Sequence, residues 1–162
     1  MFGRRPDRDA SREASPHDDA VRLLARREYS RAELEARLAA KGHAVAEIAT
    51  CLDALLEQGL QSDARFAESF IRSRVSRGQG PVKIRAELGN RGVSRELVGA
   101  ALAECEASES LDWYELACQA LTRRYAGPAD SPRERARRER FLAGRGFDFD
   151  QVQHALAHAW DS

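Results

Sequence analysis

Apolar residues recur along this chain at the three- and four-residue spacing of amphipathic helices. The clearest case surrounds three glycines, Gly42, Gly92 and Gly146. Around each glycine a leucine lies four residues before, a base directly before, and apolar residues six, nine and ten residues after. The matching residues are Leu38, Lys41, Ile48, Cys51 and Leu52, then Leu88, Arg91, Val98, Ala101 and Leu102, then Leu142, Arg145, Val152, Ala155 and Leu156. This threefold agreement indicates an internal repeat.

Each copy of the pattern predicts two helices joined by a short turn. The leucine packs on a helix face, the base complements the negative carboxyl end, and the glycine takes the left-handed conformation that ends the helix. The apolar residues that follow form the buried stripe of the next helix. Another helix face precedes each pair, with Ala20, Leu23, Leu24 and Arg27 matched by Ala67, Phe70, Ile71 and Arg74, and by Ala117, Ala120, Leu121 and Arg124.

Three start signals support the middle helix of each repeat. Ser30 with Glu33 forms a capping box, and Ser131 with Glu134 forms another, with Pro132 at the first helical position. Gly80 and Pro81 stand at the same place in the second repeat. The loop before this helix lengthens from the first repeat to the third. With the helix face before this loop and the helix after the glycine, each repeat is predicted to be three short helices.

Composition agrees with an all-α fold. Alanine and leucine number 28 and 16, whereas isoleucine, valine and threonine number 3, 7 and 2, too few to cover a sheet. We expect an elongated array of three tandem three-helix repeats, with about nine helices. The predicted segments are a flexible N-terminal tail over residues 1–17 and helical repeats over 18–60, 61–108 and 109–162. Arg138 stands where the other repeats have Leu34 and Ile84, which predicts a less firmly anchored helix.

Charge is strongly segregated although the net charge is zero. Residues 65–95 carry a net charge of +6, residues 96–115 hold six acids and no base, and residues 123–146 return to +5. Such blocks are typical of a surface meant for another macromolecule, although arginine-rich helices also keep an alanine- and leucine-rich core soluble.

No group of residues has the spacing of a catalytic or metal site. His154 and His158 lie one turn apart, but beside the core stripe of the last helix, and the three cysteines are widely separated. We interpret the run Gly78-Gln79-Gly80-Pro81 as a loop-to-helix joint and not as a phosphate cradle. The sequence therefore predicts no cofactor, no metal and no enzymatic activity. No apolar run could span a bilayer and no secretory signal is present, which favours the cytoplasm.

Two binding hypotheses remain at this point. Triplets of short helices are typical of DNA-binding modules in which one helix enters the major groove, and the +6 block would serve that role. Against this hypothesis, the third helix of each repeat carries few of the residues that read bases. In the second repeat this helix begins Arg95, Glu96, Leu97. The alternative is a protein-binding array that uses its basic and acidic segments to align along a partner.

The second repeat contains the run Asp63-Ala64-Arg65-Phe66-Ala67, Phe70-Ile71, Arg74, Gly78-Gln79-Gly80-Pro81, Lys83-Ile84, Glu87-Leu88 and Arg91-Gly92-Val93. This run resembles the central segment of the RecX family, the regulatory proteins of the RecA recombinase. The first repeat is similar to the opening repeat of that family, and the resemblance covers about residues 18–160. The third repeat departs from the pattern at Arg138.

The resemblance implies a non-enzymatic regulator that binds RecA nucleoprotein filaments and inhibits ATP hydrolysis, strand exchange and the co-protease activity of the SOS response. DNA contact would be weak or confined to the filament, and the oligomeric state, monomer or dimer by repeat exchange, stays open. The repeated Arg27, Arg74 and Arg124 fit a structural role as well as a binding one. The exposed bases that we predict to bind are Arg72, Arg77, Lys83, Arg85, Arg133, Arg135 and Arg138.

Overall fold

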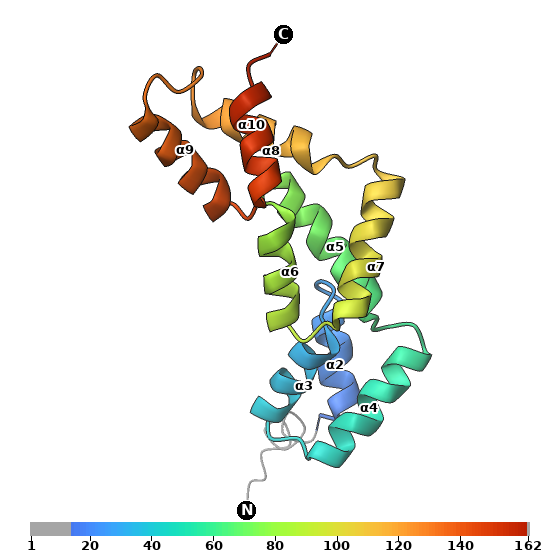
Figure 1. Ribbon diagram of the computed structural model, residues 1–162. Coiled ribbons are helices and arrows are strands. Elements are labelled where there is room, and N and C mark those ends of the chain that lie inside the picture. Colours follow the sequence, from blue (N-terminus) through green and yellow to red (C-terminus); the bar gives the residue numbers. More distant parts are fainter. Residues whose placement is uncertain (1–13, 162) are drawn as a thin grey trace, which may run out of the picture. The chain divides into compact units, whose positions relative to one another are not determined.

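A computed structural model describes residues 14–161, and within this range every regular element is a helix (Figure 1). The helices follow the predicted order of three triplets. They are α2 (Pro16–Leu24), α3 (Arg31–Ala40), α4 (Val45–Glu57), α5 (Asp63–Ser76), α6 (Pro81–Asn90), α7 (Arg95–Ser108), α8 (Trp113–Arg124), α9 (Pro132–Gly144) and α10 (Phe149–His158). Most of the tail predicted over residues 1–17 lies outside the described residues, and Pro16 and His17 already belong to α2.

The described chain divides into two compact units, the first ending at Phe66 and the second beginning at Ala67. The first unit holds α2, α3, α4 and the first turn of α5. The rest of α5 and the helices α6 to α10 belong to the second unit. Apart from residues 61–66, the second and third sequence repeats therefore share one unit.

The repeated glycines behave as the pattern predicts. Gly42, Gly92 and Gly146 have φ angles of +92°, +84° and +98°, in the left-handed region where a side chain is strained. The leucine four residues before each glycine is fully buried. The isoleucine or valine six residues after each glycine is buried as well. The same interlock of two helices thus occurs three times.

The core of the first unit packs around α4. Residues from α2, the loop before α3, α3 and α4 form one cluster, with Leu23 and Leu24 against it: Ala20, Tyr29, Leu34, Leu38, Ile48, Cys51, Leu52 and Leu55. Ser30 begins α3 with the predicted capping box, since its side chain accepts from the Glu33 N–H and the Glu33 side chain accepts from the Ser30 N–H. At α9 the Ser131 side chain caps Glu134 as predicted, but the Glu134 carboxylate accepts from the N–H of Asp130.

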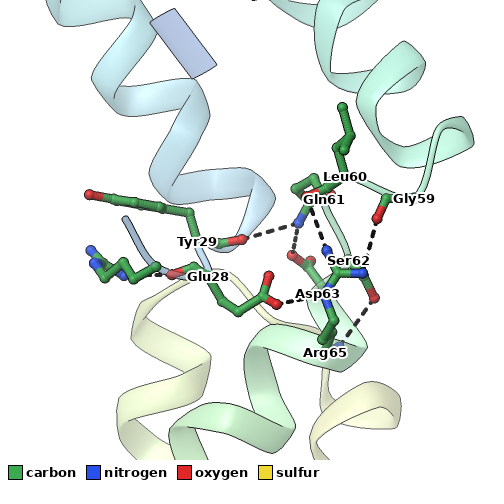
Figure 2. A network of polar contacts seen from close by, with 9 residues as sticks. Glu28, Tyr29, Gly59, Leu60, Gln61, Ser62, Asp63 and Arg65 are labelled. Carbon is green, nitrogen blue, oxygen red and sulfur yellow. Dashed lines mark hydrogen bonds and ion pairs between the residues drawn. The ribbon is translucent and has the colours of Figure 1, made fainter. Parts of the chain in front are cut away.

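A polar network fixes the start of α5 within the first unit (Figure 2). The buried Gln61 amide donates to the Tyr29 carbonyl at 3.3 Å and to the Asp63 carboxylate at 2.9 Å. Asp63 also accepts from the backbone N–H of Arg31 at 2.8 Å. Arg65 donates to the Glu28 carboxylate and to the Gly59 and Leu60 carbonyls. The turn between α4 and α5 is therefore tied to the turn that precedes α3.

The first unit also buries a carboxylate. The Asp19 side chain, on α2, lies 2.7 Å from Nε2 of His43 and 3.3 Å from Nζ of Lys41. The hydrogen bond to His43 is the main cause that holds the pKa of Asp19 below its ordinary value, and Lys41 adds to it. In the sequence repeat the positions of Asp19 and His43 are apolar in the other copies, with Phe66 and Val93 in the second.

In the second unit, the turn after α9 packs against the amino end of α6 (Figure 1). The Gly80 N–H donates to the Arg145 carbonyl at 2.8 Å, and the Val82 N–H donates to the Gly146 carbonyl at 2.9 Å. These bonds occupy amide groups that a free helix start would leave unpaired. The interpretation of residues 78–81 as a loop-to-helix joint agrees with this packing.

Candidate binding surface

The first two predicted binding residues lie at the end of α5. The Arg72 side chain is exposed and its guanidinium lies 3.8 Å from the carboxylate of Glu109, directly after α7. One basic and one acidic segment thus meet within the same unit. Arg77, also exposed, follows α5, and its carbonyl accepts a hydrogen bond from the guanidinium of Arg145 at 3.2 Å.

The two predicted residues of α6 have different surroundings. Lys83 is half-buried, and its Cβ lies where a side chain on Gly146 would have to go. Arg85 is exposed and lines a groove of about 410 Å³ together with Arg95 of α7 and the buried Val93. Arg85 is therefore free to meet a ligand, whereas the stem of Lys83 takes part in the packing of the second unit.

Among the predicted residues of α9, Arg138 is not exposed. Arg133 is exposed, and Arg135 is exposed while contacting Glu139 at 3.5 Å and Gln153 at 3.0 Å. Arg138 has only 8% of its surface exposed. Its inclusion among the exposed bases is wrong, because it fills the core position that Leu34 and Ile84 fill in the other repeats.

Arg138 anchors the long loop of the third repeat. Its guanidinium donates to the Gly127 carbonyl at 3.0 Å, and its central carbon lies 4.4 Å from the centre of the Tyr125 ring. The carboxylate of Glu134 lies 3.5 Å away. An arginine can fill such a site because its stem is apolar while its planar head satisfies polar groups. Arg138 therefore stabilises the loop between α8 and α9.

The repeated arginines differ in their surroundings. Arg27 lies over the Tyr29 ring at 3.6 Å and contacts Glu33, and Arg74 lies over the Phe70 ring at 4.5 Å and pairs with Glu87 at 3.3 Å. Both are structural residues by these contacts. Arg124 is exposed. Of the helix-end bases, Lys41 contacts Asp19 and Arg145 contacts the Arg77 carbonyl.

The structure does not collect the seven predicted residues in one place. Arg77 lines a small hollow whose other basic residues are Arg123, Arg124 and Arg145. Arg135 and Arg138 line a different hollow beside Pro128 and Trp160. Sequence spacing singled out neither Arg123 nor Arg145 as binding residues, because the hollow is made by helix ends from separate parts of the chain.

Two histidines of α10 have side-chain partners, and the cysteines are buried. His154 lies edge-on to the Tyr114 ring, with centroids 5.2 Å apart, and His158 contacts Asp161 at 2.7 Å. The three cysteines are buried, and burial is the main cause that raises the pKa of each thiol. For Cys105 the nearby Glu109 raises the pKa further.

Comparisons with known proteins match this architecture over most of the chain. Residues 17–55, 62–102 and 111–156 match the models described as the first, second and third three-helix domains of RecX. This chain belongs to the RecX family. The matched domains coincide with the three helix triplets, so both the all-α fold built from three-helix repeats and the resemblance to RecX are confirmed.

Named relatives and solved structures agree. A regulatory protein RecX from Chromohalobacter salexigens is 63% identical over 153 residues, covering 94% of this chain and 98% of the relative. One from Halorhodospira halophila is 46% identical over 144 residues, covering 88% and 86%. The crystal structure of RecX from Lactobacillus salivarius has a TM-score of 0.73 at 22% identity, covering 89% of this chain and 94% of that one, and shows the same fold.

Both of these relatives are named as regulatory proteins. Within residues 14–161, each helix is too short or too polar to cross a membrane.

Proposed function

We propose that this chain is a non-enzymatic, cytoplasmic regulator that binds nucleoprotein filaments of the RecA recombinase. In this role it inhibits ATP hydrolysis, strand exchange and the co-protease activity of the SOS response. The observation that carries the proposal is the match of all three helix triplets to the RecX domains, in a chain 63% identical to a regulatory protein RecX. RecA is proposed as the partner because the second repeat resembles the central segment of that family.

The basic side chains exposed on the second unit are the proposed contacts. Arg72, Arg77, Arg85, Arg133 and Arg135 have exposed side chains, and Lys83 is half-buried. Because a filament repeats its subunits and its DNA phosphates, several weak contacts can act together and give tight binding. A chain held in this way would occupy space that a second DNA duplex needs, and it would oppose the subunit motions that accompany ATP turnover.

The experiment is a titration of ATP hydrolysis by RecA from the same organism on single-stranded DNA. We expect inhibition at much less than one chain per RecA subunit. A parallel gel shift on naked DNA, at low and at physiological salt, should show only salt-sensitive binding. Unchanged ATP hydrolysis together with tight, salt-tolerant binding to naked DNA would replace this proposal with a tandem DNA-binding module.

A pair of charge reversals locates the surface. Arg72→Glu with Arg77→Glu should weaken filament binding without unfolding the protein, because the contact between Arg72 and Glu109 is exposed and such pairs contribute little stability. The matched control is Arg26→Glu with Arg37→Glu, which changes the net charge equally at two exposed positions of the first unit, outside the proposed surface. Full inhibition by the first variant would show that the proposed surface is wrong.

A further inference from the structure

Four arginines meet in one hollow of the second unit. Arg77 follows the end of α5, Arg123 and Arg124 end α8, and Arg145 follows the end of α9. The hollow measures about 140 Å³. Its remaining walls are Gly78, the buried Ala120 and the half-buried Phe141. A glycine and an alanine take little room, so the guanidinium groups are the main chemistry that the hollow offers.

These four positive charges have no carboxylate partners within the described part of the chain. The contacts that hold them are neutral. Arg145 donates to the Arg77 carbonyl at 3.2 Å and lies 5.4 Å from the centre of the Phe141 ring, and Arg124 lies 5.3 Å from the centre of the Tyr125 ring. The last turns of three helices also lie here, each carrying about half a negative charge. Together they offset less than half of the charge on four arginines, so the hollow keeps a strong attraction for an anion.

The geometry points to a phosphate group as the ligand of this hollow. Guanidinium groups match the oxygens of phosphate in paired hydrogen bonds, and several can surround one tetrahedral group. We propose that Arg77, Arg123, Arg124 and Arg145 form a phosphate-binding site. Its small volume admits a single phosphate or pyrophosphate group and not a whole nucleotide, since pockets for small molecules usually exceed about 300 Å³.

Two sources can present a phosphate group to this site: the backbone of a single-stranded nucleic acid, and free inorganic phosphate or pyrophosphate. Arg135, Arg137 and Arg140 lie on the neighbouring α9 but do not line the hollow. Substitutions on α9 outside the hollow can therefore distinguish binding at the hollow from a diffuse attraction of the basic α9 for any anion. The inference goes beyond the proposed function, because it can be tested with no recombinase present.

The test compares two variants that each remove two positive charges. Arg77→Ala with Arg123→Ala removes two walls of the hollow but keeps the backbone carbonyl that Arg145 contacts. Arg137→Ala with Arg140→Ala is the control, with both changes at exposed positions of α9. Circular dichroism melting checks that both stay folded. Fluorescence anisotropy with a labelled short oligothymidylate, and calorimetric titration with inorganic phosphate and pyrophosphate, then measure binding.

We expect the hollow variant to bind the oligothymidylate about tenfold more weakly than the control. The slope of log Kd against log salt should fall by about 0.7 for each lost phosphate contact. If pyrophosphate or inorganic phosphate binds the parent chain and not the hollow variant, the site takes free phosphate, and the assignment stands. Equal binding of every probe by both variants would overturn it. The assignment would also be overturned if the hollow variant lost binding to an acidic peptide while its binding of phosphate and oligothymidylate was unchanged. The ligand of the hollow would then be a carboxylate. The proposed inhibition of RecA by the parent chain does not depend on either of these two results.

Discussion

The backbone of Gly80 lies directly against that of Gly146, so closely that a Cβ on Gly80 would come within 2.5 Å of the Gly146 carbonyl carbon. The two glycines come from different sequence repeats. Two backbone hydrogen bonds, from the N–H groups of Gly80 and Val82, join the same segments. The amino end of α6 and the turn after α9 are therefore one packed structure with no room for a side chain between them.

Gly80→Ala should lower the free energy of unfolding by about 1–3 kcal/mol, the usual cost of forcing extra atoms into a packed site. The φ of Gly80 is −92°, which alanine adopts without strain, so the loss would come from the clash alone. Gly89→Ala is the control, because Gly89 lies on α6 with open space at its Cβ position and alanine favours a helix. Urea denaturation of the two variants measures the difference, and equal midpoints would contradict the close packing.

Arg138→Ala should also lower the free energy of unfolding by about 1–3 kcal/mol, because it removes the packing on Tyr125 and the bond to the Gly127 carbonyl. Arg138→Leu should cost less, since leucine fills the matching position in the first repeat. The buried Nε of Arg138 has no hydrogen-bond partner among the described residues, so its removal costs nothing in pairing.

Arg140→Ala is the control for this series. It should change stability by no more than about 0.5 kcal/mol, because Arg140 is exposed on the same helix. Thermal or urea unfolding of the three variants gives the ranking. A larger loss for Arg140→Ala than for Arg138→Ala would mean that the burial of Arg138 is not what stabilises the third repeat.

The ionisation of Asp19 should make the free energy of unfolding depend on pH. Its pKa is lowered in the folded chain, chiefly by the hydrogen bond to His43, so its contribution is present above the ordinary carboxyl pKa of about 3.9. That contribution is lost as pH falls through the lower folded value. Asp19→Asn should therefore be less stable than the parent at neutral pH and should approach it in acid. Urea unfolding at a series of pH values measures the gap.

Glu35→Gln, at an exposed position of α3, serves as the control for that series. Its stability should follow that of the parent chain at every pH. A gap between Asp19→Asn and the parent that stays constant down to strong acid would show that the Asp19 carboxylate does not stabilise the fold through its charge.

The three cysteines should be unreactive in the folded chain. Burial raises the pKa of each thiol, and the thiolate is the form that reacts. Iodoacetamide at neutral pH should add nothing to the native protein within minutes and should add three groups after urea unfolding, as read by intact mass. A rapid single adduct on the native chain would identify a thiol that the fold leaves open.

The repeat pattern predicted most of the fold because its signals are local. A left-handed glycine, a leucine one turn earlier and a stripe on the next helix need only a few neighbouring residues. All three copies confirm them, except that Leu156 in the stripe of the third copy is half-buried. The burial of Arg138 was readable from the same alignment, since Leu34 and Ile84 stand at its position. Charge alone suggested exposure there, and packing decided against it.

The arginine hollow could not be predicted in this way. Arg77, Arg123 and Arg145 are far apart in sequence, and they meet because three helices end at one place in the second unit. The contact between Gly80 and Gly146 has the same origin. Spacing within one repeat carries no information about which helix ends meet across two repeats.

The buried pair of Asp19 and His43 also distinguishes the first repeat from its copies. Where α2 supplies Asp19 and the turn after α3 supplies His43, the second repeat has Phe66 and Val93. If α2 docked into the second repeat, in this chain or in another copy, the carboxylate would be buried beside valine without a donor, which is costly. The pair therefore favours the docking of α2 into a first repeat over a second one, whether that first repeat belongs to the same chain or to another copy.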